Sequence, residues 1–217
     1  MTYQLNAIFS LTIGIGAIIG WVRFRKTDPA FFPFLLLLTI AFVNEVTSIV
    51  LLQTGNSNVI NFNVFELVES FLLTWQFLKW GLFEKRRVLY FVVQCLFGCL
   101  WIGENFVTSF QFFDSYFIII HSFAFVMMAI SMINGIVLKE SLSLLKQPVF
   151  LICMGLIIYY NYAVLVEAFW VFGLYHSKVF RLAIYEILAY VNLVTNLIFA
   201  FAFLWIPMRV QYILQSL

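Results

Sequence analysis

Long apolar stretches, separated by short polar segments, recur along the whole chain. Each stretch is close to the roughly 20 residues that an α-helix needs to cross the hydrocarbon layer of a membrane. The stretches do not alternate between polar and apolar positions, as the strands of a membrane barrel would. The pattern therefore predicts seven membrane-spanning helices, over residues 4–22, 31–52, 61–81, 88–108, 115–137, 148–172 and 182–206.

The composition agrees with this pattern. Of the 217 residues, 64% are hydrophobic and only 10% are charged. Soluble domains are about 45–50% apolar and about 25% charged, so the composition excludes a soluble fold. It also excludes intrinsic disorder, which requires low hydrophobicity. We expect an all-α polytopic membrane protein with one domain over residues 1–217, the lipid bilayer as its partner and no nucleic-acid partner.

The basic residues predict the orientation of the helices. Ten of the twelve Lys and Arg residues follow the first, third, fifth and seventh spans, and only Lys178 and Arg181 fall on the other side. Basic loops stay on the cytoplasmic side of a membrane. We therefore expect the N-terminus outside and the C-terminus in the cytoplasm, in a plasma or inner membrane.

Two pairs of short segments suggest an internal repeat. Residues 64–68, VFELV, resemble residues 184–188, IYEIL, in the seventh span. In the preceding spans, residues 42–45, FVNE, resemble residues 159–162, YYNY. Either the chain contains two duplicated triple-helix halves, or apolar segments resemble each other here by chance.

If the repeat is real, residues 1–84 and 112–217 form two parallel halves, and the helix at 88–108 is the linker between them. This plan of three helices, one helix and three helices is similar to that of the SWEET and PQ-loop transporters. The chain contains no Pro-Gln pair, which is the signature of that family. The seven-helix topology also resembles G-protein-coupled receptors and the sensor regions of bacterial histidine kinases.

Glutamates inside the spans are the most informative residues. Six of the ten acidic residues fall within predicted spans, and all six lie in the predicted outer half: Glu45, Glu66, Glu69, Glu104, Glu167 and Glu186. Each ionisable residue costs roughly 2.5–3.5 kcal/mol at the middle of a membrane, so such residues normally face the interior of the bundle and serve a function. The placement predicts an acidic cavity that opens to the outer side.

Helical spacing groups these glutamates with other polar residues. One stripe is formed by Asn63, Glu66, Ser70 and Thr74, which are three or four residues apart. Further stripes contain Tyr160 and Glu167, Gln94 and Glu104, and Glu186, Asn192 and Asn196. Asn44 and Asn161 occupy matching positions of the two halves, and Asn134 is expected to extend the polar track inward. Two alternatives are that some glutamates are hydrated by lipid headgroups, or that protonated glutamates bond across helices as structural links.

Three functions fit such a cavity. The first is a small carrier for a cation, a proton-coupled solute or a small polar solute, with Glu45, Glu66, Glu69, Glu104, Glu167, Glu186, Asn44 and Asn161 as the binding residues. The second is a sensor that binds a ligand, such as a cationic small molecule, in the outer cavity and moves a protein partner on the inner side. The third is an intramembrane, metal-dependent lipid enzyme. A subunit of a larger assembly, including a homo-oligomer, is a further alternative.

The candidate metal ligands are His121, Glu66 and Glu69, which would hold a divalent ion. His176 also maps to the outer side, but no His-Glu-x-x-His spacing exists in the chain. Cys95 and Cys99 are four residues apart, which suits either a ligand pair or small packing residues. With Cys153, they make an odd number of cysteines inside spans, so no disulfide framework is expected.

Overall fold

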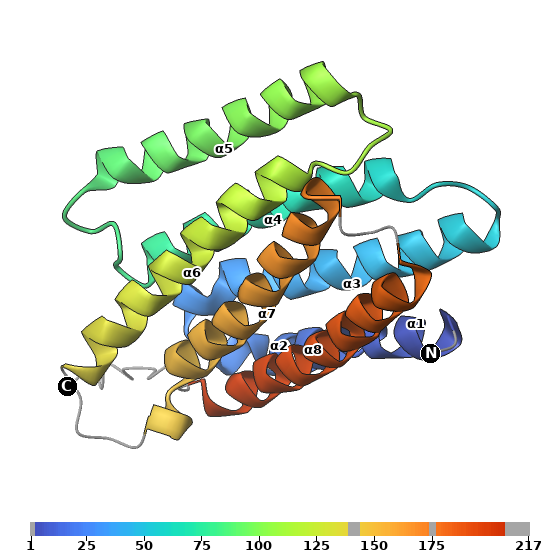
Figure 1. Ribbon diagram of the computed structural model, residues 1–217. Helices are drawn as coiled ribbons and strands as arrows, with labels where there is room; N and C mark the ends of the chain where they lie inside the picture. Colours follow the sequence, from blue (N-terminus) through green and yellow to red (C-terminus); the bar gives the residue numbers. More distant parts are fainter. Residues whose placement is uncertain (1–2, 139–143, 174–176, 207–217) are drawn as a thin grey trace, which may run out of the picture.

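The computed structural model describes residues 3–138, 144–173 and 177–206. All regular structure in these ranges is helical, and the long helices form one bundle in which successive helices run in opposite directions (Figure 1). The helices are α1 Tyr3–Leu11, α2 Ile13–Arg23, α3 Phe32–Gln53, α4 Val59–Lys79, α5 Arg87–Thr108, α6 Ser115–Val137, α7 Pro148–Val171 and α8 Lys178–Trp205. Short 3-10 turns lie at Phe24–Lys26, Pro29–Phe31 and Leu144–Lys146. Lys139, Glu140, His176 and Arg209 lie outside the described residues.

The helices follow the predicted spans closely. Six helical segments are long and apolar enough to cross a membrane, which confirms an integral membrane protein of the all-α class. The predicted third span forms α4, whose polar residues lower its hydropathy. Because α4 packs against α3, α5 and α6, its polar face is turned into the bundle. That α4 crosses the membrane stays a prediction, and so do the total of seven spans and the orientation of the bundle.

The first span is one segment broken into two helices at Thr12. The backbone there makes a tight turn, in which the Thr12 N–H donates to the Phe9 carbonyl at 3.3 Å. The Asn196 side chain of α8 donates to the Thr12 hydroxyl at 3.1 Å, and so ties the break to the last helix. Beyond the break, Gly20 lets α2 approach α3 closely, because a Cβ at this position would lie only 2.4 Å from the Leu35 side chain.

The two ends of the bundle differ in charge. We call the end where α4 and α6 begin the acidic end, because Glu66, Glu69 and Asp114 lie there. We call the end where α2 and α4 finish and α5 begins the basic end, because it carries Arg23, Arg25, Lys26, Lys79, Lys85, Arg86 and Arg87. Figure 1 shows that α1 begins at the acidic end and that α8 finishes at the opposite one.

Aromatic packing fills the core of the bundle. Phe34, Phe77 and Phe125 are completely buried, and the Phe77 and Phe125 rings stack with their centroids 6.4 Å apart. Near them, the Gln76 side chain accepts a hydrogen bond from the Phe34 N–H and donates one to the Ala30 carbonyl, both at 2.7 Å. Gln76 thereby satisfies a backbone N–H at the start of α3, which has no partner within its own helix.

The helix α5 stands apart from this core. It lies along one side of the bundle in Figure 1, where it contacts α4 and α6. Phe97 is its main buried residue, whereas Phe91, Ile102 and Phe106 are exposed. Exposed apolar side chains on a helix of this length are those expected of a surface in contact with lipid. Cys95 and Cys99 are also exposed, and among the described residues neither belongs to a group of three or more potential metal ligands.

Candidate metal centre

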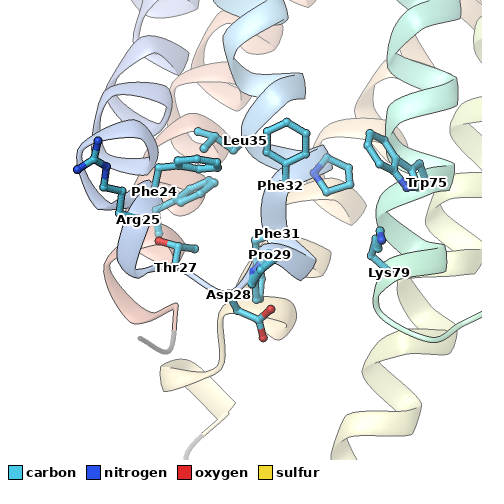
Figure 2. Close-up of a pocket in the computed structure, with 12 residues that line it drawn as sticks. Phe24, Arg25, Thr27, Asp28, Pro29, Phe31, Phe32, Leu35, Trp75 and Lys79 are labelled. Carbon is cyan, nitrogen blue, oxygen red and sulfur yellow. The ribbon is translucent and has the colours of Figure 1, made fainter. Parts of the chain in front are cut away.

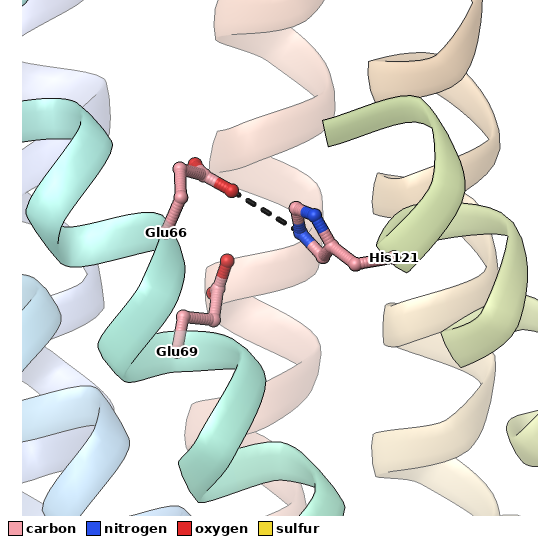
Figure 3. A group of neighbouring side chains, drawn as sticks. All are labelled: Glu66, Glu69 and His121. Atoms are coloured by element: carbon pink, nitrogen blue, oxygen red, sulfur yellow. Dashed lines mark ion pairs between the residues drawn. The ribbon is translucent and has the colours of Figure 1, made fainter. Parts of the chain in front are cut away.

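Two helices bring three ionisable side chains together at the acidic end. Glu66 and Glu69 are three residues apart on α4 and therefore share a face, and His121 projects toward them from α6 (Figure 3). One ligand atom from each residue lies within 4.8 Å of the others. All three residues are buried, with exposed fractions of 3% for Glu66, 8% for Glu69 and 0% for His121. We call this group the triad.

A backbone carbonyl fixes the histidine ring. The His121 Nδ1 lies 2.9 Å from the Phe117 carbonyl oxygen, one helical turn earlier. A carbonyl can only accept a hydrogen bond, so Nδ1 carries a proton, and in the neutral ring Nε2 then has a free lone pair. This Nε2 lies 3.2 Å from Glu66 Oε2. Metal-bound histidines are usually held in this way, with the second nitrogen donating to a carbonyl or carboxylate.

Several buried polar atoms of this region form no hydrogen bond. Among the described residues, Glu69 Oε2, His121 Nε2 and the Tyr160 hydroxyl have no hydrogen-bond partner. The Tyr160 hydroxyl nevertheless lies close enough to interact with the Glu69 carboxylate. A buried polar group without a partner costs about 1–3 kcal/mol. A cation bound between the two carboxylates and Nε2 would remove this cost and neutralise the buried charge.

Aromatic rings enclose the histidine on the remaining sides. The His121 ring centroid is 4.7 Å from that of Phe117, 5.5 Å from that of Phe125 and 6.0 Å from that of Tyr160. Such a shell excludes water and lowers the local dielectric constant, so electrostatic interactions within the triad are strong. The shell also restricts rotation of the imidazole, which keeps Nε2 directed toward the carboxylates.

A cavity leads from the acidic end toward the triad. A vestibule of about 600 Å³ is lined by Asn44, Glu45, Ser48, Glu167, Trp170 and Asn192, among others. A smaller chamber of about 70 Å³ lies next to it, and Ser10, Glu45 and Asn192 line both spaces. The chamber reaches Glu69 and Tyr160. Glu69 thus connects the buried triad with the polar cavity.

Two of the predicted glutamates and one asparagine line the vestibule. Glu45 is half-buried on α3 and Glu167 is half-buried on α7, where it accepts a hydrogen bond from the Ser115 hydroxyl at 2.6 Å. Asn44 is buried and accepts a hydrogen bond from the Asn61 side chain at 2.7 Å. The structure therefore brings these three residues to the same cavity, at one side of the triad.

Three other predicted residues are placed elsewhere. Glu104 accepts hydrogen bonds from the backbone N–H groups of Tyr116 and Phe117, at 3.0 and 2.6 Å, and so stabilises the start of α6. Asn161 is exposed on α7 and donates to the Ile157 carbonyl of its own helix at 2.8 Å. Glu186 is half-buried on α8 and does not line the vestibule or the chamber.

The predicted polar stripes are only partly confirmed. Asn63, Glu66, Ser70 and Thr74 are all buried on one face of α4, as their spacing predicts. Asn134, which was expected to extend a polar track inward, is exposed on α6. The pairs that suggested a repeat have unlike surroundings: Glu66 is buried in the triad while Glu186 is half-buried, and Asn44 is buried while Asn161 is exposed. The repeat is therefore not shown.

One acidic residue that lies between two predicted spans is part of the buried network. Asp114, which precedes α6, has an exposed fraction of 0% and accepts a hydrogen bond from the Asn105 side chain at 2.7 Å. Burial raises the pKa of Asp114 to about 6, while the Asn105 hydrogen bond opposes this shift and the charge of Glu104 adds to it. A polar residue directly before a helix is a known capping signal that could have indicated its location.

The triad thus contains both oxygen and nitrogen ligands beside a polar cavity. Comparisons of the chain with protein-family models, with curated proteins and with solved structures found no match. The function is therefore argued from the geometry of the triad and of the cavity that leads to it.

Proposed function

We propose that this membrane protein carries a divalent transition-metal ion and that Glu66, Glu69 and His121 bind it. The observation that carries the proposal is the convergence of three buried ligand atoms within 4.8 Å, beside a polar cavity. Two carboxylates and an imidazole suit ions of the zinc, iron or manganese class. Calcium and magnesium instead favour sites built from six or more oxygen ligands.

The spacing of the ligand atoms is compatible with such an ion. Zinc binds nitrogen and carboxylate oxygen at about 2.0–2.2 Å, so ligand atoms in a tetrahedral site lie about 3.4 Å apart. Glu66 Oε2 and His121 Nε2 are already 3.2 Å apart. Glu69 has a buried oxygen without a hydrogen-bond partner, which would be available to the ion.

The cavity supports a route for a cation. Glu167 lies on the wall of the vestibule, and Glu45 lies on the walls of both the vestibule and the chamber. Carboxylates on the walls of a cleft raise the local concentration of cations. An ion would pass Glu45 on its way to Glu69, where the exchange of water for protein ligands begins.

Packed side chains lie on the other side of the triad. Leu73 and Phe77 follow Glu69 along α4, and Phe125 follows His121 along α6, and all three are completely buried. A carrier must expose its site alternately to each side of the membrane. In a carrier, this packed layer would open toward the basic end in a second conformation. The conformation described here would then be the one in which the site is reached from the acidic end.

Metal uptake by the purified protein in liposomes tests the carrier function. We expect zinc uptake at least tenfold above that of empty liposomes, and we expect Glu69→Gln to abolish it, because the substitution keeps the side-chain size but removes the negative charge. Glu186→Gln is the matched control, since it changes a glutamate of a spanning helix that does not line the cavity. Tight zinc binding without any uptake would contradict the carrier function.

A second function is favoured by the number of ligands and by the lining of the vestibule. A catalytic zinc site keeps three protein ligands and one open position. The vestibule beside the triad also contains apolar residues, including Leu52, Phe62 and Leu188, which would accommodate a lipid chain. A zinc-dependent lipid enzyme would convert a lipid in a mixed micelle, and would lose this activity in His121→Gln. Mass spectrometry of the lipids checks this alternative.

A further inference from the structure

A second cavity lies at the basic end, remote from the triad along α4. It has a volume of about 500 Å³ and lies between the end of α2, the start of α3 and the end of α4. Figure 2 shows Phe24 and Phe32 within it, with Arg25 on one side and Lys79 on the other. Trp75 completes the aromatic lining beside Lys79. We call this cavity the basic pocket.

The pocket exists because the chain turns sharply between α2 and α3. After the 3-10 turn Phe24–Lys26, the backbone is extended at Thr27 and Asp28, with ψ angles of 148° and 127°. It then enters the 3-10 turn Pro29–Phe31, which leads directly into α3. This connection bends around the pocket and leaves the space between α2 and α4 unfilled.

The charges around the pocket are unbalanced. Arg25 and Lys79 are exposed, and neither forms an ion pair with another described residue. Asp28 is the acidic residue of the lining, but its carboxylate accepts a hydrogen bond from the Ala30 N–H at 2.8 Å and is directed to the backbone. The pocket therefore presents two unpaired cations beside an aromatic wall.

The combination indicates an amphiphilic anion. A free phosphate would use the two cations but would gain nothing from Phe24, Phe32 and Trp75. A phospholipid would use both features, because its phosphate pairs with the cations while its acyl chains cover the aromatic wall. The location agrees, since basic pockets between membrane helices bind anionic headgroups. Cavities of this volume commonly hold ligands, and 500 Å³ would hold a headgroup with the first part of its chains.

We propose that the basic pocket binds an anionic glycerophospholipid, with the headgroup at the charged rim that carries Arg25 and Lys79 and the acyl chains along Phe24, Phe32 and Trp75. Long basic side chains extend their charged groups toward a membrane surface while their stems pack on apolar groups. The site is independent of the triad and does not depend on whether the protein carries a metal. A lipid bound there would also hold the connection between α2 and α3 against the end of α4.

Native mass spectrometry of the full chain in detergent tests this site. Phosphatidylglycerol and phosphatidylcholine with identical acyl chains are added to the wild type and to the double variant Arg25→Gln/Lys79→Gln. We expect the wild type to prefer phosphatidylglycerol by about 25-fold, because each of the two basic residues near a headgroup contributes about fivefold. We expect the double variant to lose this preference.

The double variant Arg86→Gln/Arg87→Gln is the matched control. It removes the same charge from the same end of the bundle, but neither residue lines the pocket. We expect the control to keep the preference for phosphatidylglycerol. An equal loss in both double variants would show a diffuse charge effect and overturn the proposal, as would an unchanged preference in Arg25→Gln/Lys79→Gln.

A competition experiment separates a lipid from a free phosphate. We expect inorganic phosphate at millimolar concentration to leave bound phosphatidylglycerol in place, because it cannot occupy the aromatic wall. Displacement of the lipid by inorganic phosphate would overturn the proposal in favour of a small-anion site. Size-exclusion chromatography and circular dichroism establish that both double variants are folded, which is expected because all four substituted side chains are exposed.

Discussion

The two ends of the bundle use their space in opposite ways. At the acidic end, Glu66, Glu69 and His121 are buried together, and polar residues line a cavity of about 600 Å³ beside them. At the basic end, most charged side chains stay exposed, while aromatic and aliphatic residues such as Phe31, Leu35 and Phe203 are buried beneath them. Buried ionisable groups are costly unless they are paired, whereas exposed ones cost little. The difference supports placing the proposed metal centre at the acidic end, and it shows that packing dominates beneath the charged residues of the basic end.

The largest expected effect is on metal affinity at the acidic end. In His121→Gln, we expect zinc to bind at least about 100-fold more weakly, because the substitution removes a residue that contacts the metal. Loss of a residue that only hydrogen-bonds a metal ligand already weakens binding by about 10–100-fold. Isothermal titration calorimetry measures the change. Glu186→Gln serves as the control and should bind zinc as the wild type does. Equal weakening in both variants would place the metal outside the triad.

Packing at the basic end gives the next largest effect. In Gly20→Ala, the new Cβ would clash with the buried end of the Leu35 side chain, so Leu35 or its surroundings must shift. We expect a loss of about 1–3 kcal/mol in stability, as for other overpacked cores. Gly103→Ala on α5 is the control: nothing lies within 4 Å of its Cβ, so the better helix propensity of Ala should leave the stability unchanged or raised. Thermal unfolding in detergent compares the two, and equal melting temperatures would contradict the close contact.

A smaller effect concerns the pH dependence of stability at the acidic end. The pKa of Asp114 is raised from 3.8 to about 6, so the folded protein binds its proton more tightly than the unfolded chain does. The stabilisation from this proton is complete below pH 3.8 and is lost as the pH rises through about 6. We expect the wild type to lose stability relative to Asp114→Asn between pH 4 and pH 7. Over this range, the melting temperature of the wild type minus that of the variant should fall by a few degrees. Parallel pH profiles of the two proteins would be inconsistent with a buried Asp114 carboxyl.

The smallest effect is expected from Asn161. This residue is exposed and bonds only to its own helix in the structure, so Asn161→Leu should change neither zinc affinity nor stability measurably. Asn44→Leu should weaken both, because Asn44 is buried, lines the vestibule and accepts a hydrogen bond from Asn61. Equal effects of the two substitutions would indicate that Asn44 and Asn161 occupy equivalent positions, as an internal repeat requires.

Much of the fold follows from hydropathy, because every spanning helix must satisfy its own backbone hydrogen bonds. The same spacing argument places Glu66, Ser70 and Thr74 on one buried face of α4. The candidate ligands Glu66, Glu69 and His121 were also chosen from the sequence alone, as the acidic pair and the histidine predicted at one depth. The structure then places ligand atoms of all three residues within 4.8 Å of one another.

The remaining site residues depend on details that spacing does not reveal. The rotation of a helix about its axis decides whether a polar residue faces a cavity, so Asn44 and Asn161 differ although their sequences look alike. A position near the end of a span does not predict the role of a glutamate either. Glu104 accepts hydrogen bonds from the first N–H groups of α6, while Glu167 lines the vestibule. Asp114 lies between two predicted spans, and the sequence does not show that this connection folds back into the bundle.

The most direct test of the metal centre is the metal content of the purified protein after incubation with zinc and removal of the excess. Elemental analysis should find one zinc ion per chain in the wild type and less than about a tenth of that amount in Glu66→Gln/Glu69→Gln, since two of the three ligands lose their charge. A folded double variant that keeps one zinc ion per chain, or a wild type that holds none, would contradict the assignment of Glu66, Glu69 and His121 as a metal centre.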